Sequence, residues 1–386
     1  MRSITILGAT GSIGTSTLDL IERNPDAYRV EALTANCDFA KLAAAAIRTH
    51  AKLAVVADEA CLADLRAALA GTGIEAAGGE EAIIEAAARP VDWTMGAIVG
   101  CAGLKPTMAA IEAGGTIVLA NKEPLVAAGD VILAAAKASG ATLLPADSEH
   151  NAIFQCFDFA RPERVRRIIL TASGGPFRDR PIEAMRNVTR EQAVAHPNWS
   201  MGAKISINSA TMMNKGLELI EAARLFPVRH DQIEIVVHRQ SIIHSMVDYV
   251  DGSILAQLGP SDMRTPIAHT LAWPDRMETP MQPLDLVAIG RLDFEAPDAA
   301  RFPALRLAKE ALDAGGASPA VLNAANEIAV AAFLAGKIGF LDIVLTVEQA
   351  LDRYNGPPAP STIDEVLMVD DMARQLARAT TERKAA

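Results

Sequence analysis

The sequence has few aromatic residues, few cysteines, and no long apolar run. Aromatic residues make up 4% of the 386 residues, whereas 50% are hydrophobic, so aliphatic side chains and alanine must supply most of the core. The four cysteines form no C-x-x-C pair, which argues against a disulfide framework or a zinc knuckle. No apolar run approaches the roughly 20 residues that a transmembrane helix needs, so we expect no membrane partner.

Basic runs are also absent, and the formal net charge is −11. A nucleic-acid footprint needs a basic face, so we expect no nucleic-acid partner. Residues 1–7 already have the pattern of a strand and contain one basic residue, Arg2, which does not fit a signal peptide. These features predict a cytoplasmic protein. At roughly 100–200 residues per domain, the length predicts two or three domains.

Short apolar segments alternate with helical patterns over the first 145 residues. Strands are expected at 3–7, 30–34, 53–56, 97–99 and 116–119, and helices at 15–22, 41–49, 58–70, 80–88 and 106–113. This alternation is typical of βαβ units. We therefore predict an α/β fold whose N-terminal domain contains a doubly wound, parallel, Rossmann-like sheet.

The alternation ends near residue 145. Strands are expected at 167–171, 233–237, 244–250 and 253–258, and a helix at 209–226. Asp251-Gly252 is a hairpin signal between the last two strands. We predict an N-terminal domain over 1–147, an α+β domain over 148–273, a proline-rich linker over 274–303 and a C-terminal helical domain over 304–386.

A glycine-rich turn, Gly8 to Gly14, joins the first strand to the first helix in the pattern G-x-x-G-x-x-G. Such glycines let the backbone approach a pyrophosphate, and the N–H groups at the start of the helix favour its negative charge. The alternative is a plain strand-to-helix turn. The position directly after an N-terminal strand favours a dinucleotide site.

Four further motifs carry a family resemblance. They are LANKE at 119–123, LPADSEHN at 144–151, HPNWSMG at 196–202 and NSATMMNKGLE at 208–218. In this order and spacing they closely resemble the 1-deoxy-D-xylulose 5-phosphate reductoisomerases. The resemblance extends from the glycine turn to about Ala332. It implies that residues 1–147 bind NADPH and that residues 148–273 hold the metal and the catalytic residues.

The resemblance implies a divalent-metal site formed by Asp147, Glu149 and Glu218. Carboxylates without cysteine favour a hard ion, Mg²⁺ or Mn²⁺. Asp147 and Glu149 are two residues apart, so an extended backbone would direct both carboxylates to one side. From the residues alone, Asp-Ser-Glu-His is more typical of a helix cap, with Ser148 or Asp147 capping a helix from Asn151.

The family motif also implies a phosphosugar site. Ser173, Ser209, Asn214 and Lys215 would hold the phosphate, and hydroxyl, amide and ammonium groups are suitable donors for a dianion. Residues 213, 217 and 220 would form an apolar stripe facing the core. The alternative is an ordinary solvated Asn/Lys/Glu face. The remaining substrate contacts implied are Lys122, Ser148, Glu149, His196 and Glu218, of which Lys122, Glu149 and His196 are the catalytic candidates.

The segment from His196 to Met201 has the composition of a lid, with Trp199 covering the site. The alternative is a surface loop whose tryptophan is folded inward. His238 and His244 are left without a catalytic assignment, because both also fit ordinary strand positions.

The resemblance implies NADPH contacts at Gly8, Thr10, Gly11, Ser12, Ile13, Asn36, Asn121, Glu123 and Gly202. After the second strand, Asn36-Cys37-Asp38 lacks the basic residues common in the family, and the first cation is Lys41. Asp38 would repel a 2′-phosphate if it faced the ribose, or it would cap the next helix. We therefore expect a weaker preference for NADPH over NADH than a basic segment would give.

The resemblance implies an enzyme that rearranges 1-deoxy-D-xylulose 5-phosphate and reduces an aldehyde intermediate to 2-C-methyl-D-erythritol 4-phosphate, in non-mevalonate isoprenoid biosynthesis. Retro-aldol cleavage followed by aldol addition is the favoured family mechanism, and the sequence leaves a single-step shift open. The family also implies a homodimer. Two alternatives explain the glycine turn: a simple dehydrogenase of a small hydroxy acid, and a non-catalytic NADP-sensing module. Neither accounts for the clustered carboxylates.

Overall fold

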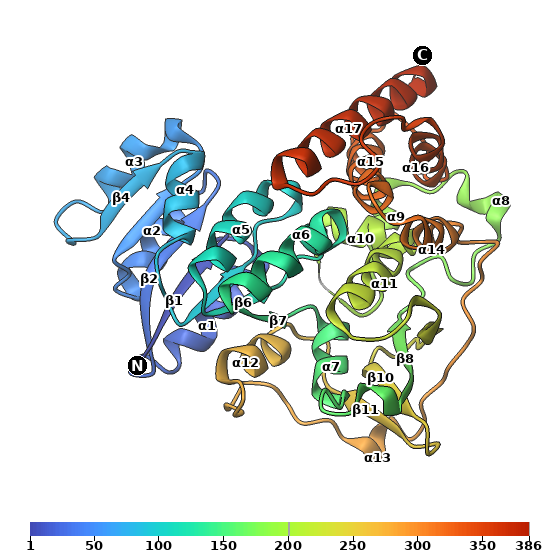
Figure 1. The fold of residues 1–386 in the computed structure, drawn as a ribbon, viewed down its shortest axis with the longest axis horizontal. Coiled ribbons are helices and arrows are strands. Elements are labelled where there is room, and N and C mark those ends of the chain that lie inside the picture. Colours follow the sequence, from blue (N-terminus) through green and yellow to red (C-terminus); the bar gives the residue numbers. More distant parts are fainter. Residues whose placement is uncertain (200, 386) are drawn as a thin grey trace. The chain divides into compact units, whose positions relative to one another are not determined.

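The computed structural model describes residues 1–199 and 201–385, and these form two compact units. Unit 1 comprises Met1–Pro124, Ile132–Asn151 and Asp262–Met281. Unit 2 comprises Leu125–Val131, Ala152–Ser261 and Gln282–Ala386. Each unit therefore combines segments that are distant in the sequence. Figure 1 labels the helices and strands.

Unit 1 is built on a seven-stranded parallel sheet. Its strands are β1 (Arg2–Leu7), β2 (Tyr28–Ala35), β3 (Leu53–Val56), β4 (Glu75–Gly78), β5 (Trp93–Gly96), β6 (Thr116–Leu119) and β7 (Thr142–Pro145). Their order is β4-β3-β2-β1-β5-β6-β7. The order reverses direction between β1 and β5, which confirms the predicted doubly wound sheet. The predicted strand at 97–99 is wrong, because β5 ends at Gly96.

Helices connect these strands. The helices of the N-terminal part are α1 (Ser12–Glu22), α2 (Phe39–Arg48), α3 (Leu62–Ala68), α4 (Glu80–Ala87) and α5 (Leu104–Ala113), with 3-10 turns η1 (Glu59–Cys61) and η2 (Gly100–Gly103). Two helices, α6 (Glu123–Ser139) and α7 (Ser148–Cys156), contribute residues to both units. Ile4 and Ile6 of β1 are fully buried, as expected for a parallel strand covered on both faces.

The segment Asp262–Met281 returns to unit 1 and contains α12 (Arg264–Ala272). Arg264 Nη1 donates to Asp19 Oδ2 on α1 at 3.0 Å, and Trp93 Nε1 donates to Thr270 O at 3.1 Å. Trp93 is fully buried, so α12 closes the core beside β5. These residues fall within the predicted α+β domain over 148–273, because no local pattern reveals contacts across about 250 residues of chain.

Unit 2 contains a mixed four-stranded sheet. Its strands are β8 (Val165–Ala172), β9 (Ile233–Val237), β10 (Ile243–Tyr249) and β11 (Ile254–Leu258), in the order β11-β10-β8-β9. β10 is antiparallel to both β8 and β11, whereas β8 and β9 are parallel. Gly252 has φ of +90° in the turn between β10 and β11, which confirms the predicted hairpin.

The helices of unit 2 fall into two groups. Those near the sheet are α8 (Ile182–Met185), α9 (Arg190–Val194), α10 (Ala203–Ala210), α11 (Met213–Leu225) and α13 (Leu286–Ile289), with 3-10 turns η3 (Pro162–Arg164) and η4 (His230–Gln232). The C-terminal helices are α14 (Ala304–Ala314), α15 (Ser318–Leu334), α16 (Asp342–Arg353) and α17 (Ile363–Ala385). They confirm the predicted helical C-terminal region.

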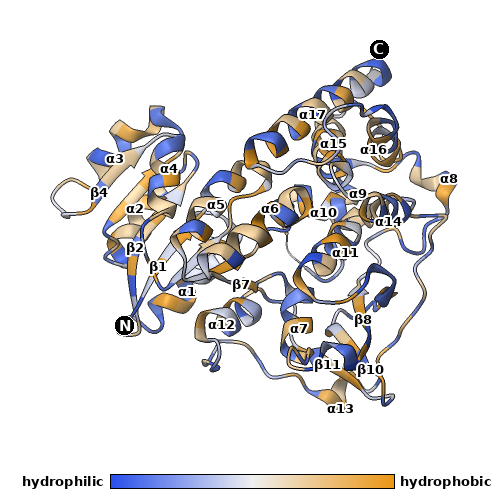
Figure 2. Ribbon diagram, in the orientation of Figure 1, coloured by the Kyte–Doolittle hydropathy of each residue, from blue (hydrophilic) through white to orange (hydrophobic). Residues whose placement is uncertain are grey.

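Helix α15 is the most deeply buried of the C-terminal helices: Val321, Leu322 and Ala329 are each fully buried. Val330 and Phe333 join a core cluster with Ile207 of α10. Hydrophilic and hydrophobic residues alternate along α17, as expected for a helix with one buried face (Figure 2). Helix α15 therefore links the C-terminal helices to the part of unit 2 that contains α10.

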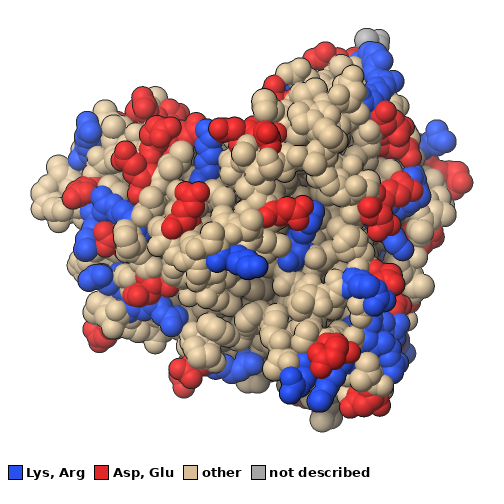
Figure 3. Space-filling view, in the orientation of Figure 1, with Lys and Arg blue, Asp and Glu red and all other residues tan. Residues whose placement is uncertain are grey.

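Acidic and basic side chains are interspersed on the face of the molecule that Figure 3 shows. Among the residues that the structure describes, no helix combines the length and the apolar character needed to cross a membrane.

Candidate active site

The glycine turn joins β1 to α1 at the carboxyl edge of the parallel sheet. Gly8 has φ of +90°, and a Cβ there would lie 2.7 Å from Ala97 O, so only glycine fits. A Cβ at Gly14 would lie 2.4 Å from Gly8 O, so this glycine lets α1 approach the turn. The first helical hydrogen bond runs from Thr15 N to Gly11 O at 2.9 Å. The N–H groups before it form a helix N-terminus that favours an anion.

Asn121 and Glu123 lie at the same edge of the sheet, directly after β6. Asn121 is 8% exposed, and its Nδ2 has no hydrogen-bond partner among the residues that the structure describes. Buried amides are normally paired, so this donor fits a ligand group. Gly11, Ser12 and Asn36 are exposed at the surface. Three of the predicted nucleotide contacts of unit 1 are thus exposed, whereas Asn121 and Glu123 are buried, and Gly202 belongs to unit 2.

Asp38 caps α2. Its Oδ1 accepts from Lys41 N at 3.1 Å, and its Oδ2 lies 2.9 Å from Lys41 Nζ. These hydrogen bonds from Lys41 lower the pKa of the Asp38 carboxyl. Of the two alternatives for Asp38, the structure contains the helix cap. Lys41, the first cation after β2, therefore already forms an ion pair with Asp38.

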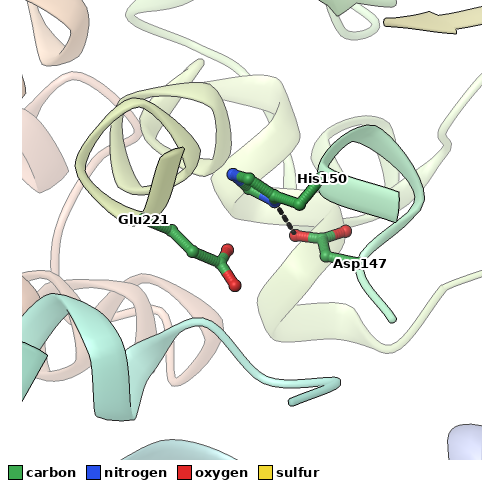
Figure 4. A group of neighbouring side chains, drawn as sticks. All are labelled: Asp147, His150 and Glu221. Atoms are coloured by element: carbon green, nitrogen blue, oxygen red, sulfur yellow. Dashed lines mark ion pairs between the residues drawn. The ribbon is translucent and has the colours of Figure 1, made fainter. Parts of the chain in front are cut away.

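A carboxylate cluster follows β7. Asp147 Oδ2 lies 2.5 Å from Lys122 Nζ and 3.7 Å from His150 Nδ1, and Figure 4 shows the pair that Asp147 makes with His150. Ser148 begins α7 and donates to Glu149 Oε2 at 2.6 Å. The predicted extended backbone is therefore wrong, because Glu149 lies in the first turn of a helix. Negative side chains are favoured at that end of a helix.

The Asp147 carboxyl group is ionised. Burial by itself raises its pKa, but the positive charge of Lys122 and the neighbouring imidazole of His150 outweigh burial and hold the pKa well below its usual range. The His150 side chain is fully buried, so this interaction is shielded from solvent. Asp147 thus presents a fixed negative charge, which is the form that binds a metal ion.

The predicted helix over 209–226 is two helices. Helix α10 ends at Ala210, Met212 adopts φ of +62°, and α11 begins at Met213. Thr211 Oγ1 bridges the break by accepting from Met213 N at 3.3 Å. Asn214 and Lys215 therefore lie in the first turn of a helix. Their position at a helix N-terminus adds the positive end of the helix dipole to their own donor groups.

The polar side of α11 is buried. Lys215 is 4% exposed and Glu218 is 0% exposed, so the alternative of a solvated face is wrong. Lys215 Nζ pairs with Glu218 Oε2, and Asn214 Nδ2 donates to Glu218 Oε1. The predicted apolar stripe is confirmed, because Met213, Leu217 and Ile220 are all buried. A buried lysine beside a buried carboxylate is typical of a binding site.

A second glycine turn follows β8. Gly174 and Gly175 both have positive φ, +79° and +68°, and a Cβ on Gly175 would lie 2.6 Å from Ser209 O at the end of α10. This close approach brings the Ser173 turn against α10. Ser173 Oγ accepts from Gly175 N at 3.2 Å. Two of the predicted phosphate residues, Ser173 and Ser209, therefore lie on neighbouring segments of unit 2.

His196 is oriented by hydrogen bonds to both ring nitrogens. Its Nδ1 accepts from Asn198 N at 3.2 Å and from Trp199 N at 2.9 Å. Because Nδ1 is the acceptor, Nε2 carries the proton, and it lies 2.9 Å from Ser173 Oγ. The histidine is thereby held as a neutral donor that points toward the Ser173 turn.

The predicted lid, His196–Met201, contacts the turn between β9 and β10. Asn198 Nδ2 donates to Arg239 O at 2.7 Å and to Ser241 Oγ at 2.9 Å. The Trp199 ring meets the His244 ring edge-on, with centroids 5.9 Å apart, and Trp199 is half-buried. These contacts fix the lid against unit 2. Ser200 lies outside the described residues.

Replacing Trp199 by alanine tests whether this segment is a lid. We expect kcat/KM to fall by at least about tenfold, because water exclusion is lost. Unfolding free energy should fall by only about 0.5–1.5 kcal/mol, the value of an aromatic pair. Thermal denaturation of Trp93→Ala, a fully buried tryptophan, supplies the contrast, with a loss of about 3–5 kcal/mol. A loss of that size in Trp199→Ala would identify Trp199 as a core residue.

Sequence reasoning missed three residues of this region. His150 pairs with Asp147, Glu221 is fully buried on α11, and Asn198 fastens the lid. Glu218 and Glu221 are three residues apart, which places both on one side of a helix. The sequence alone therefore indicates that Glu221 lies near Glu218. The Asn198 contacts depend on tertiary structure, and no sequence pattern predicts them.

Comparison with known proteins gives one consistent result. The family model of 1-deoxy-D-xylulose 5-phosphate reductoisomerase matches residues 4–129. The model of the 1-deoxy-D-xylulose 5-phosphate reductoisomerase C-terminal domain matches residues 143–226. A third model, the DXP reductoisomerase C-terminal domain, matches residues 258–376. The 1-deoxy-D-xylulose 5-phosphate reductoisomerase of Zymomonas mobilis is 62% identical over 381 residues, covering 99% of this chain and 98% of that protein. The Rhodospirillum centenum protein of the same name is 57% identical, with 98% and 94% covered.

Solved structures agree with the sequence matches. The Zymomonas mobilis reductoisomerase in complex with NADPH has a TM-score of 0.94 and 61% identity, covering 99% of each chain. A DOX-P reductoisomerase in complex with NADPH, fosmidomycin and magnesium has a TM-score of 0.95 and 46% identity, covering 99% of this chain and 98% of that chain.

Proposed function

The chain belongs to the 1-deoxy-D-xylulose 5-phosphate reductoisomerase family, and on this premise we propose which of its residues carry out the reaction. The enzyme rearranges 1-deoxy-D-xylulose 5-phosphate and reduces the resulting aldehyde to 2-C-methyl-D-erythritol 4-phosphate, with NADPH and a divalent metal ion. One observation carries the assignment of residues: two of the three carboxylates at the predicted metal positions, Asp147 and Glu218, each pair with a lysine at a predicted substrate position.

Asp147, Glu149 and Glu218 would hold Mg²⁺ or Mn²⁺. The donor set fits a hard ion, because it consists of carboxylate oxygens only. Lys122 and His150 keep Asp147 ionised, and Lys215 with Asn214 compensates the charge of the fully buried Glu218. When bound, the metal ion supplies Lewis-acid stabilisation of negative charge on substrate oxygens, and NADPH supplies hydride.

Ser173, Ser209, Asn214 and Lys215 would bind the substrate phosphate. Three features support this assignment: the α11 N-terminus, the buried ammonium of Lys215, and the close approach of the Ser173 turn to Ser209. A phosphate dianion needs several charge-assisted donors, and these residues supply backbone N–H, hydroxyl, amide and ammonium groups. A small phosphosugar is therefore the partner that this region fits.

His196 and Lys122 act as donors to the substrate in this proposal. The backbone of the lid holds His196 Nδ1 as an acceptor, so Nε2 keeps its proton and can donate to a substrate oxygen. Lys122 lies beside Asp147 and places an ammonium at the carboxylate cluster, where it orients oxygens of the sugar with Ser148. Trp199 and Asn198 close the lid and exclude water from reactive intermediates.

The cofactor contacts are proposed at the glycine turn, Asn36 and the segment after β6. Gly8, Thr10, Gly11, Ser12 and Ile13 would receive the pyrophosphate. Asn121 offers an amide donor without a hydrogen-bond partner in the part of the chain that the structure describes. Glu123 of unit 1 and Gly202 of unit 2 complete the predicted set.

The Asp38 cap gives a prediction about cofactor choice. Asp38→Asn keeps a good capping side chain, removes one negative charge and releases Lys41 from its ion pair. We expect the ratio of kcat/KM for NADPH over NADH to rise by about two- to fivefold. Steady-state kinetics with both cofactors measure it. Asp285→Asn, which changes a helix cap in unit 2, is the matched control. A wild-type preference for NADH would overturn the NADPH assignment.

We further propose that the enzyme works as a cytoplasmic homodimer. The edge strand β11 and helix α13 expose large apolar side chains: Ile254 is 49%, Leu255 51%, Leu286 61% and Val287 91% exposed. Exposed apolar residues at a sheet edge are typical of an association surface.

Metal dependence tests the proposed function. Chelator-treated protein should not oxidise NADPH when 1-deoxy-D-xylulose 5-phosphate is added, and Mg²⁺ or Mn²⁺ should restore the reaction. A simple dehydrogenase would keep its activity without metal, and an NADP-sensing module would bind NADPH without turnover. Either of those results would contradict the proposal.

A further inference from the structure

We propose that Glu327 on α15 is a positioning residue for the lid and the phosphate site, because it anchors α10 through Lys204. Helix α10 begins directly after the lid and carries Ser209 in its last turn. The inference rests on the proposed function, since it assigns a role to the C-terminal helices in binding the same phosphosugar. Glu327 itself touches neither substrate nor cofactor in this proposal.

Glu327 lies at the centre of a chain of ion pairs in unit 2. Its Oε1 accepts from Lys204 Nζ of α10 at 2.8 Å, and its Oε2 accepts from Arg374 Nη2 of α17. Arg374 in turn pairs with Asp370 on the same helix. The Glu327 side chain is 13% exposed. Burial alone would raise its pKa, but Lys204 and Arg374 lower it, so the carboxylate is charged.

A second contact joins the same two helices. Asn326 Nδ2 of α15 donates to Asn208 Oδ1 of α10 at 2.9 Å, and both side chains are buried. Lys204 and Asn208 are four residues apart, so they lie on one side of α10. Two directional contacts one helical turn apart fix both the rotation of α10 about its axis and its position along α15.

The two ends of α10 connect this anchor to the site. Gly202 precedes the first residue of α10, and Met201 is the last residue of the lid. Ser209 follows Asn208 directly. With α10 held against α15, lid movement is confined to residues before Gly202, and Ser209 keeps its place beside the Ser173 turn. A buried ion pair is a weak source of stability compared with apolar packing, so its main contribution here is a fixed geometry.

Lys204→Met is the primary test variant. Glu327→Ala would leave two cations without their anion, whereas Lys204→Met leaves Glu327 paired with Arg374. We expect KM for the phosphosugar and Kd for a phosphonate inhibitor, the latter measured by calorimetry, to rise about tenfold. The affinity for NADPH should change less, because all of its proposed contacts except Gly202 belong to unit 1. Lys204→Arg should restore the wild-type values, because arginine can still pair with Glu327.

Two more variants make the test decisive. Glu327→Gln should weaken phosphonate binding in the same direction as Lys204→Met, which separates anchoring of α10 from a direct contact of Lys204 with the ligand. Glu348→Gln removes an ion pair between α14 and α16 and should leave phosphonate binding unchanged. The proposal would be overturned if Lys204→Met and Glu327→Gln lose thermal stability without a change in phosphonate Kd. It would also be overturned if Lys204→Met weakens phosphonate binding and Glu327→Gln does not. If the wild type binds the phosphonate but does not convert the substrate, the proposed function is wrong. The phosphonate Kd values of the variants then still test whether Glu327 positions α10.

Discussion

Glu218→Gln is expected to lower kcat by at least about a hundredfold, the usual effect of removing a group that stabilises transition-state charge. The substitution keeps the size of the side chain and the Oε1 that accepts from Asn214. It removes the charge that pairs with Lys215 and that we assign to the metal. NADPH binding should persist, because the glycine turn, Asn36 and Asn121 belong to unit 1, whereas Glu218 belongs to unit 2.

The fold should survive this substitution. Leaving the buried Lys215 without its anion costs about 3–5 kcal/mol, and a typical domain has about 5–15 kcal/mol in reserve. Kinetics across a titration of Mg²⁺ and Mn²⁺, with NADPH binding followed by fluorescence, measure the two effects separately. Glu348→Gln, which changes a half-buried carboxylate on α16, should leave both unchanged. Near-normal turnover of Glu218→Gln at any metal concentration would exclude Glu218 as a ligand.

Lys215→Ala should weaken a phosphonohydroxamate inhibitor such as fosmidomycin by about 10- to 150-fold, which corresponds to a hydrogen bond to a charged group of about 1.5–3 kcal/mol. The ammonium is buried at the start of α11, so solvent does not screen its attraction to a phosphonate. Ser209→Ala, which removes a neutral donor from the same site, should weaken the inhibitor by no more than about tenfold. Calorimetry measures both affinities.

A stability measurement accompanies the Lys215 prediction. Without Lys215, the fully buried Glu218 loses the cation that balances its charge, so thermal stability should fall in metal-free buffer. Added Mg²⁺ should restore much of this stability if Glu218 is a metal ligand. Unchanged inhibitor affinity in Lys215→Ala, at full thermal stability, would place the phosphate elsewhere.

The fold was largely predictable where local patterns repeat. Alternating buried strands and helices identify the parallel sheet, but several details were not readable, and strand β7 and helix α6 are absent from the expected elements. Apolar residues continue beyond Gly96, so the sequence does not show that β5 ends at this residue. In the structure, the chain leaves the strand there and passes beside Gly8. Strand β4, Glu75–Gly78, was missed because it has no large apolar side chain.

The site was predictable to the level of motifs, while its geometry depended on backbone features without a sequence signal. No glycine or proline marks the break between α10 and α11, because Met212 itself adopts the left-handed conformation. The break moves Asn214 and Lys215 from mid-helix to a helix N-terminus. Similarly, the helical start of α7 replaces the expected extended backbone around Asp147 and Glu149, because the chain passes directly from β7 into a helix.

The most direct measurement is the carbon skeleton of the product. Protein incubated with ¹³C-labelled 1-deoxy-D-xylulose 5-phosphate, NADPH and Mn²⁺ is analysed by mass spectrometry and NMR. We expect a branched polyol phosphate, 2-C-methyl-D-erythritol 4-phosphate, formed with one equivalent of NADPH oxidised. A reduced product with the unbranched skeleton of the substrate, or NADPH oxidation that does not require the metal ion, would contradict the account.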